Sequence, residues 1–292
     1  MQTVSFRREM KRAAVAVGLQ PLLFSESVVW PAVLWVNRCS SNPTQVRLCG
    51  EIGDSRMTMQ GLSCVENCLN CHLRSRNFFC DLSQDSIEVL SKIKHAAVFP
   101  EHAVVLVEGQ SPFGIFILCQ GRAKLSTTSR EGKTLILRIA EAGEVLGLDA
   151  VVTGKPHEFT VETMRPCQLN YVGREDLLRF LKDHADACLH ATQHLAQGCS
   201  DSYGLVRSIG LSRVSDRLAN FLLDTASDGK ITNGAVRVRL GLSHEEISQV
   251  VGTNRETITR LLSEFKKNEL AEINGATLII HNLPALRSRV RA

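Results

Sequence analysis

Glycine residues at regular steps divide the middle of this chain, and their spacing restricts the fold more than any other feature of the sequence. Gly109, Gly121, Gly132 and Gly143 follow one another at intervals of 12, 11 and 11 residues, with short apolar runs between them. Evenly spaced short strands separated by glycine turns are typical of an antiparallel sandwich or roll. The sequence therefore predicts an antiparallel β-roll with strands over residues 104–107, 114–118, 123–126, 134–139, 159–163 and 168–172.

The pattern becomes helical after the expected roll, over residues 185–208. Apolar and small side chains recur there at steps of 3, 4, 3, 4 and 3 residues, which is the heptad spacing of a helix that pairs with a second copy of itself. The seam residues are Leu189, Thr192, Ala196, Cys199, Tyr203 and Val206. The alternative is a helix that packs on its own roll. Gly198 and Gly204 each weaken the helix by roughly 1 kcal/mol relative to Ala, so we expect a weak dimer contact.

The C-terminal part of the sequence predicts a winged helix-turn-helix. Ser243 is the expected N-cap of a first helix, and Glu246 three residues later completes a capping box. Gly252 makes the turn to a second helix over residues 254–267. Asn274-Gly275 between two apolar runs is typical of a tight hairpin, which here forms the wing.

The start of the second helix carries the residues expected to contact DNA. In helix-turn-helix proteins this end of the helix enters the major groove. Arginine can bond to guanine O6 and N7 with two hydrogen bonds, and glutamate can accept from cytosine N4. The alternative is an ordinary solvated face. The expected DNA-contacting residues are Ser243, Thr253, Arg255, Glu256, Thr259 and Arg260.

The charge distribution agrees with a DNA-binding C-terminal third. The whole chain has a net charge of only +4. Residues 207–292 contain 13 Lys or Arg against 9 Asp or Glu, so this segment carries an excess equal to that of the whole chain. Such a bias favours double-stranded DNA as a partner.

Four cysteines crowd into seventeen residues ahead of the roll. Cys64, Cys68, Cys71 and Cys80 follow the spacing Cys-x3-Cys-x2-Cys-x8-Cys. Sulfur atoms this close in sequence can converge on one point, usually for a metal ion or an iron–sulfur cluster. Because thiols stay reduced in the cytosol, a metal site is favoured over disulfides for a cytoplasmic protein.

Other classes of protein find little support in the sequence. No uninterrupted apolar run reaches the ~18 residues that span a bilayer, so no membrane partner is expected. The chain has no P-loop, no paired catalytic carboxylates and no nucleophile triad, so we do not expect an enzyme. The domain organisation we predict is an N-terminal extension (1–59), a cysteine loop (60–81), a β-roll sensor domain (82–184), a dimerisation helix (185–208) and a winged helix-turn-helix domain (209–292).

The order of these parts resembles the Crp/Fnr family of bacterial transcription regulators. The resemblance runs from about Cys64 to the C-terminus, and the segment Arg255-Glu256-Thr257-Ile258-Thr259-Arg260 resembles the recognition helix of the family. It implies an α+β fold with a cyclic-nucleotide-binding-like jelly roll, a homodimer, and RNA polymerase as a partner. Both arginines and the glutamate match the cyclic-AMP receptor branch, which binds TGTGA half-sites; the Fnr branch usually lacks the first arginine and binds TTGAT.

The resemblance does not favour cyclic AMP as the signal. The glycine turn of residues 143–147 is present, but it is shared widely across the family. Residues 155–160 read Lys-Pro-His-Glu-Phe-Thr, where the cyclic-AMP branch has an arginine for the phosphate. Glu158 would repel a phosphate.

The cysteines instead resemble those of the oxygen-sensing Fnr branch. That branch holds a [4Fe-4S] cluster on three N-terminal cysteines and one distant cysteine, which implies Cys68, Cys71, Cys80 and Cys167 here, with Cys64 as the alternate ligand. Eight residues separate Cys71 from Cys80 where the Fnr pattern usually has five. The resemblance implies that the cluster senses oxygen, redox state or nitric oxide and controls dimerisation and DNA binding.

Some cysteines are expected to be packing residues, and two other functions stay open. Cys119, Cys188 and Cys199 lie on predicted core or dimer faces. One alternative is a family member without an iron–sulfur cluster, which binds zinc or a small effector. The other is an iron–sulfur electron-transfer protein.

Overall fold

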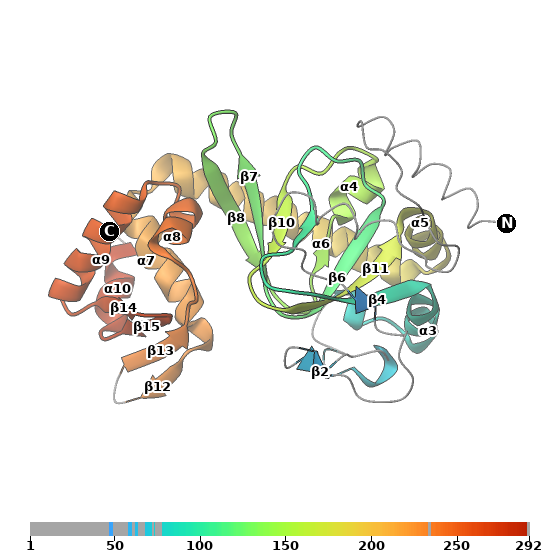
Figure 1. The fold of residues 1–292 in the computed structure, drawn as a ribbon, viewed down its shortest axis with the longest axis horizontal. Helices are drawn as coiled ribbons and strands as arrows, with labels where there is room; N and C mark the ends of the chain where they lie inside the picture. The colour runs from blue at the N-terminus through green and yellow to red at the C-terminus, as the bar shows by residue number, and fades with distance from the viewer. Residues whose placement is uncertain are drawn as a thin grey trace. The chain divides into compact units, whose positions relative to one another are not determined.

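The computed structural model describes residues 47–48, 58–59, 62–63, 68–71, 73, 78–232 and 235–290 of the chain (Figure 1). The expected N-terminal extension therefore lies outside the described residues, apart from the short strands β1 (Arg47–Leu48) and β2 (Thr58–Met59). Cys64 lies outside them as well. β2 pairs with β3 (Leu62–Ser63).

Two antiparallel sheets form the expected β-roll. The first has the strand order β1-β4-β11-β6-β9 and the second the order β5-β10-β7-β8. The first sheet contains β4 (Lys94–Phe99), β6 (Gly114–Gln120), β9 (Val145–Leu146) and β11 (Cys167–Gly173). The second contains β5 (Val104–Leu106), β7 (Ala123–Thr128), β8 (Thr134–Ala140) and β10 (Thr160–Thr163). The prediction of an antiparallel roll is confirmed.

The glycine spacing marks turns of this roll, as the sequence predicts. The four glycines have positive φ angles between +80° and +104°. β4 and β9 were not predicted from the sequence. β4 follows a helix with no turn residue between them, and β9 has only two residues, too few for an alternating pattern.

Helices cover one face of the first sheet. They are α3 (Gln84–Ile93), α4 (Leu148–Thr153), α5 (Arg174–Asp183) and the first half of α6 (Ala185–Leu211). Ser83 is the N-cap of α3, because its side chain accepts a hydrogen bond from the Ser86 backbone N–H. Apolar side chains of these helices and of the sheet form one buried core, which includes Phe79, Ile87, Leu90, Ile115, Ile117, Val172 and Leu177.

The long helix α6 presents two different faces. Ala187 and Ala191 are buried against the sensor core, so its first half does pack on its own roll. All six seam residues lie on the exposed face, where Leu189 is 58%, Tyr203 67% and Val206 71% exposed. The two interpretations of this helix are thus compatible, since the seam stays free for a second copy.

The C-terminal domain has the winged helix-turn-helix arrangement. It contains α7 (Val214–Thr225), α8 (His244–Val251), α9 (Arg255–Lys267) and α10 (Leu283–Val290). Its sheet has the order β12-β13-β15-β14, with β12 (Lys230–Thr232), β13 (Ala235–Arg239), β14 (Ala271–Asn274) and β15 (Thr277–Ile280). The capping box of Ser243 and Glu246 is present, and Gly252 ends α8 with φ +71°.

Three features of this domain were not expected from the sequence. They are strand β12, helix α10 and the short helix η3 (Ala226–Asp228), which follows α7. Among the described residues, no helix is both long and apolar enough to cross a bilayer.

We predict that Gly121→Ala destabilises the β-roll by about 3 kcal/mol, whereas Gly132→Ala costs only about 1 kcal/mol. Both residues have positive φ, which disfavours an added Cβ by roughly 1–2 kcal/mol. At Gly121 the Cβ would also overlap Cys167 Sγ, whereas at Gly132 no atom lies within 4 Å of it. Overpacking of that kind adds about 1–3 kcal/mol. Urea unfolding of both variants measures the difference, and equal losses would contradict this account of the turn.

Candidate functional site

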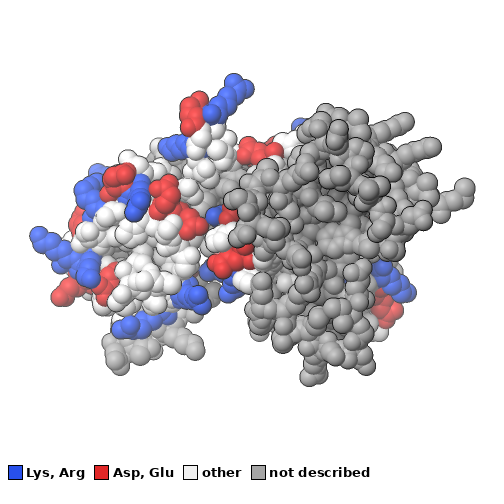
Figure 2. Space-filling view, in the orientation of Figure 1, with Lys and Arg blue, Asp and Glu red and all other residues white. Residues whose placement is uncertain are grey.

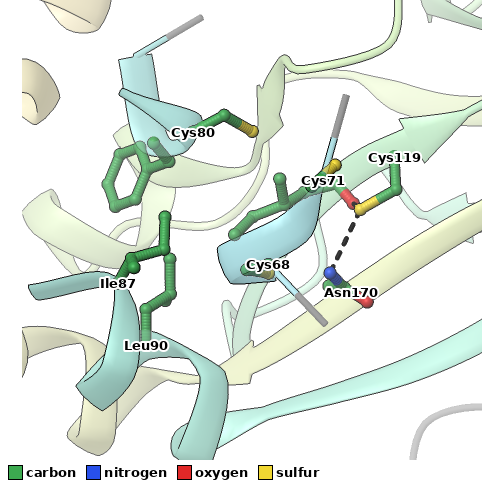
Figure 3. A pocket seen from close by; sticks show the side chains of 9 residues that line it. Cys68, Cys71, Cys80, Ile87, Leu90, Cys119 and Asn170 are labelled. Atoms are coloured by element: carbon green, nitrogen blue, oxygen red, sulfur yellow. Dashed lines mark hydrogen bonds between the residues drawn. The ribbon is translucent and has the colours of Figure 1, made fainter. Parts of the chain in front are cut away.

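Three cysteines of the N-terminal array meet a fourth cysteine from the β-roll at one pocket (Figure 3). Cys68 and Cys71 come from the short helix η1 (Cys68–Asn70) and its end, and Cys80 ends the short helix η2 (Phe78–Cys80). Cys119 comes from β6. The residues that line the pocket are Cys68, Cys71, Phe79, Cys80, Ile87, Leu90, Ile117, Cys119 and Asn170.

The pocket surrounds its thiols with apolar side chains, and burial there raises the pKa of Cys80 and of Cys119. Burial, together with the neighbouring Cys71 and Cys68, raises the pKa of the Cys80 thiol to about 12. Burial also raises the pKa of Cys119 well above its ordinary value, and Cys68, Cys80 and Cys71 add to this shift. Without a cation the two buried thiols are therefore protonated and unreactive. A bound metal centre reverses this, because it stabilises the thiolate form.

Among the described residues, donors reach two of the sulfur atoms at this pocket. The backbone N–H of Leu73 donates to Cys71 Sγ at 3.5 Å. Asn170 Nδ2 donates to Cys119 Sγ at 3.1 Å (Figure 3). Such donors stabilise electron-rich sulfur.

Cys167 lies elsewhere, although the family resemblance implies it as a ligand. Its side chain is fully buried at the start of β11, and its Sγ donates to the carbonyl oxygens of Arg165 at 3.1 Å and Arg122 at 3.3 Å. Burial raises its pKa to about 11. The structure therefore brings Cys68, Cys71 and Cys80 together with Cys119, and Cys167 does not line their pocket.

The other cysteines differ from their predicted roles in part. Cys119 was expected to be a packing residue, but it faces the cysteine pocket as well as the core. Its alternation with Ile115 and Ile117 along one strand was the signal available in the sequence. Cys188 and Cys199 are exposed on α6, the second of them on the seam.

The donor set fits an iron–sulfur cluster. Four thiols around an apolar pocket match the soft sulfur ligands that such clusters require. Within the part of the chain that the structure describes, no group of three or more His, Cys, Asp or Glu forms a ready-made site for a metal ion. A tetrahedral zinc ion would need sulfur atoms about 3.8 Å apart, given a Zn–S distance of ~2.3 Å. A cluster of several iron atoms is larger and holds its thiolates further apart.

The pocket is connected directly to the start of α6. Three residues after Cys80, the backbone N–H of Ser83 donates to Asp186 Oδ2 at 3.0 Å. The Ser86 hydroxyl donates to Asp186 Oδ1 at 2.7 Å. Burial raises the pKa of Asp186, but these hydrogen bonds outweigh it and hold the pKa well below its ordinary value. The ionised Asp186 thus ties the segment after the cysteines to the first turn of the long helix.

The helix-turn-helix exposes most of the predicted DNA-contacting residues. Asn254 caps α9 by accepting from the Thr257 backbone at 2.8 Å. Beyond this cap, Arg255, Glu256 and Arg260 are exposed. Figure 2 shows basic side chains interspersed with acidic ones on the face of this domain that is turned to the viewer.

The remaining predicted DNA contacts have structural roles as well. Ser243 is bonded to Glu246 in the capping box. The Thr259 hydroxyl bonds to the Arg255 carbonyl at 3.0 Å and lies 3.1 Å from His244 Nδ1. Thr253 is half-buried next to the turn.

Arg217 supports the turn between α8 and α9 and was missed by the sequence analysis. Its Nε donates to the Val251 carbonyl at 2.8 Å, and its Nη1 donates to the Ser212 carbonyl at 2.8 Å. Its Nη2 reaches the Gly252 carbonyl at 3.4 Å. Carbonyls at a helix end have no partner within the helix, so this arginine satisfies them. No local pattern marks it, because the Val251 and Gly252 carbonyls lie more than thirty residues away.

The segment that would bind a cyclic phosphate in the cyclic-AMP branch contains a buried histidine. His157 is 2% exposed, and neither of its ring nitrogens has a partner among the described residues. Burial lowers its pKa, which favours the neutral ring. Glu144 in the preceding glycine turn pairs with Arg138. A neutral histidine offers no charge to a phosphate.

Two segments of the chain match models of known protein families. Residues 97–184 match the model of the cyclic nucleotide-binding domain, and residues 216–289 match that of the Crp-like helix-turn-helix domain. The chain is 24% identical over 220 residues to the CRP-like cAMP-activated global transcriptional regulator of Mycobacterium tuberculosis, which covers 75% of this chain and 98% of that protein. It is 25% identical over 191 residues to the global nitrogen regulator of Synechocystis sp., covering 64% of this chain and 85% of that protein.

The fold is similar to that of solved structures. One is the c-di-GMP responsive global regulator CLP of Xanthomonas campestris, with a TM-score of 0.62 and 20% identity. The match covers 68% of this chain and 100% of that chain.

We predict that Asp186→Asn lowers the stability of the sensor domain by about 1–2 kcal/mol near neutral pH. Hydrogen bonds to a charged group contribute about 1.5–3 kcal/mol, reduced here because Asp186 is partly exposed. Its folded pKa is depressed, so this contribution is complete above the ordinary Asp pKa of about 3.9 and is lost as the pH falls below it. The difference in melting temperature from wild type should therefore shrink below about pH 4. Asp183→Asn, an exposed neighbour, is the control, and a pH-independent difference would contradict the prediction.

Proposed function

The chain belongs to the Crp/Fnr family of DNA-binding transcription regulators, and from this we propose that it senses oxygen, nitric oxide or redox state through a [4Fe-4S] cluster held at its cysteine pocket. The observation that carries the proposal is the meeting of Cys68, Cys71 and Cys80 at one apolar pocket beside α6. Thiols gathered in this way match the ligand requirement of an iron–sulfur cluster.

The residues of the pocket would hold the cluster and limit access of water to it. When bound, such a cluster supplies a redox-active centre that responds to oxygen and nitric oxide. Phe79, Ile87 and Leu90 form apolar walls around the sulfur atoms. Because low polarity and hydrogen bonds to sulfur both tune such a centre, the Leu73 N–H to Cys71 is part of the site.

The pocket can influence α6 through the segment that follows Cys80. The short helix η2 contacts α6, and Asp186 is bonded to Ser83 and Ser86 just beyond it. A cysteine segment held at the pocket keeps Ser83 in place for Asp186, and release of the segment removes that restraint. The start of α6 is therefore the element that carries the signal in our proposal.

In our proposal, the signal acts on dimerisation through the exposed seam of α6. Regulators of this family bind DNA as dimers, and a two-fold pair of recognition helices binds half-sites about one DNA turn apart. The seam is marginal, because it contains small and polar side chains with Gly198 and Gly204 between them. A marginal contact can be switched by a modest change at one end of the helix.

The exposed residues of α9 favour a TGTGA-like half-site. Arg255 and Glu256 occupy its first turn and Arg260 lies about one turn later, all three exposed. This is the pattern of the branch that binds TGTGA. We therefore propose a palindrome of two such half-sites as the DNA target, with RNA polymerase as the further partner.

Cyclic AMP is the competing signal, since the sensor domain matches the cyclic nucleotide-binding domain and one relative is named as cAMP-activated. Against it, the segment of residues 155–160 has a buried neutral His157 and the acidic Glu158 where that branch has an arginine. Zinc held by the cysteines is the competing metal.

We predict that the protein purified without oxygen is brown and contains about four iron and four sulfide per protomer. Air should bleach it and weaken its DNA binding at least tenfold, because the cysteine segment loses its anchor. Iron and sulfide analysis, absorbance and DNA-binding titration before and after air exposure measure this.

The matched control is the Cys68→Ser, Cys71→Ser, Cys80→Ser variant, which should hold no iron and bind DNA equally with and without air. Added cyclic AMP should change neither state. A colourless protein loaded with zinc, or oxygen-dependent DNA binding that persists in the triple variant, would refute the proposal.

We predict that Arg260→Ala weakens binding to a TGTGA palindrome by about 10–100-fold, because a bidentate arginine–guanine contact contributes about 1–3 kcal/mol. Arg287→Ala, an exposed arginine on α10, is the control and should change affinity less than threefold. Titration of both variants on matched and scrambled DNA measures the effect. Selection from random DNA that returned TTGAT half-sites would contradict the assignment.

A further inference from the structure

We propose that Cys119 of β6 is the fourth cysteine ligand of the cluster, in place of Cys167. The assignment rests on the proposed function and deepens it, because it identifies the strand to which the N-terminal cysteines are fastened. The support comes from the shared pocket, from the pairing of β6 with β11, and from the hydrogen-bond partners of the two candidate thiols.

The first support is that Cys119 lines the same pocket as the other three cysteines. Cys68, Cys71, Cys80 and Cys119 all face it, and the rest of its wall is apolar except for Asn170 (Figure 3). Cys119 is 6% exposed, so it is covered from solvent. A fourth sulfur at this place completes the set of four that a [4Fe-4S] cluster takes.

The pairing of strands shows how Cys119 reaches the pocket. In the ladder between β6 and β11, Gln168 is opposite Gln120 and Leu169 is opposite Leu118. Cys119 is thus the additional residue of a β-bulge, with no Cα partner in this ladder. Bulges are frequent next to functional sites, where they redirect one side chain. The side chain of Cys119 packs with Ile115 and Ile117 on the helix-covered face, where the N-terminal cysteines lie.

Cys167 lies on the other face of its strand. Side chains alternate along a strand, and Cys167 is three positions from Asn170, whose amide reaches Cys119. The Cys167 thiol instead lies against the backbone at Gly121 and donates to the carbonyls of Arg122 and Arg165. Its thiol is therefore directed toward this backbone, and Cys167 does not line the cysteine pocket.

Asn170 provides independent evidence that Cys119 has more than a packing role. This amide is 1% exposed, and its Oδ1 has no partner among the described residues. Burying such a group is costly in an apolar environment. The one hydrogen bond that it makes in the described structure goes to Cys119 Sγ. A buried amide kept for a single sulfur is the arrangement expected of the outer shell of a metal site, where donors stabilise the ligand atoms.

The test compares ligand variants of the full chain, reconstituted with iron and sulfide without oxygen. Cys119→Ser is expected to lower bound iron and sulfide at least fivefold. The iron and sulfide content of Cys167→Ser should differ from that of wild type by no more than about 25%. Cys119→Asp, which restores an oxygen ligand, should recover a cluster with a changed electron paramagnetic resonance spectrum after reduction. Circular dichroism melting of each variant shows whether it is folded.

Each outcome separates this assignment from the proposed function. A Cys119→Ser protein that holds a full cluster would overturn the assignment, and loss of the cluster in Cys167→Ser alone would return the fourth position to Cys167. Both results leave a cluster-based sensor intact. A wild-type protein that takes up neither iron nor sulfide would refute the proposed function and the assignment together. If Cys119→Ser does not fold, a Cys119→Asp cluster with a changed electron paramagnetic resonance spectrum decides for the assignment, and a full Cys119→Asp cluster with the wild-type spectrum decides against it.

Discussion

The burial of Phe79 is the contact on which the sensor half of the structure depends. Phe79 lies directly before Cys80 in η2 and is only 1% exposed, in the core between the first sheet and its helices. Removing a buried phenylalanine side chain typically costs about 3–5 kcal/mol. This anchor fixes Cys80 at the pocket and brings η2 against α6 at the same time. The cysteine site and the start of α6 therefore share one piece of packing, which is the physical basis of the coupling that we propose between them.

Local patterns in the sequence were sufficient for most of the fold. The glycine turns and the capping box of Ser243 and Glu246 are each set by a few neighbouring residues, and all appear as expected. Features that depend on distant partners were missed. Arg217 meets carbonyls more than thirty residues away, and β9 is too short to show a period. The periodicity of a sequence indicates which face of a helix or strand is apolar. It does not indicate which other element packs against that face.

The cysteine site is a second case in which contacts between distant residues could not be predicted from the sequence. The clustering of Cys68, Cys71 and Cys80 predicted a shared site, and these three do line one pocket. The position of the fourth thiol depends on a single additional residue in β6, which is invisible to a count of spacings. A family resemblance indicates which position along the chain corresponds to a ligand. Whether the side chain at that position reaches the pocket depends on the face of the strand on which it lies. Cys119 and Cys167 come from neighbouring strands, yet their side chains have different surroundings.

The weakness of the α6 seam is consistent with its place in this arrangement. Coupling between two sites typically amounts to about 1–3 kcal/mol, so it can decide an equilibrium only where the competing states differ by a similar amount. A seam of large apolar residues would hold the dimer together whatever happened at the cysteine pocket. Gly198 and Gly204 lower helix stability by roughly 1 kcal/mol each, and Thr192 and Ala196 bury little area. In our proposal the Asp186 hydrogen bonds at the start of the helix therefore need to supply only a change of this size. A marginal seam is what the proposed coupling requires, because a strong dimer would persist in both states of the cysteine pocket.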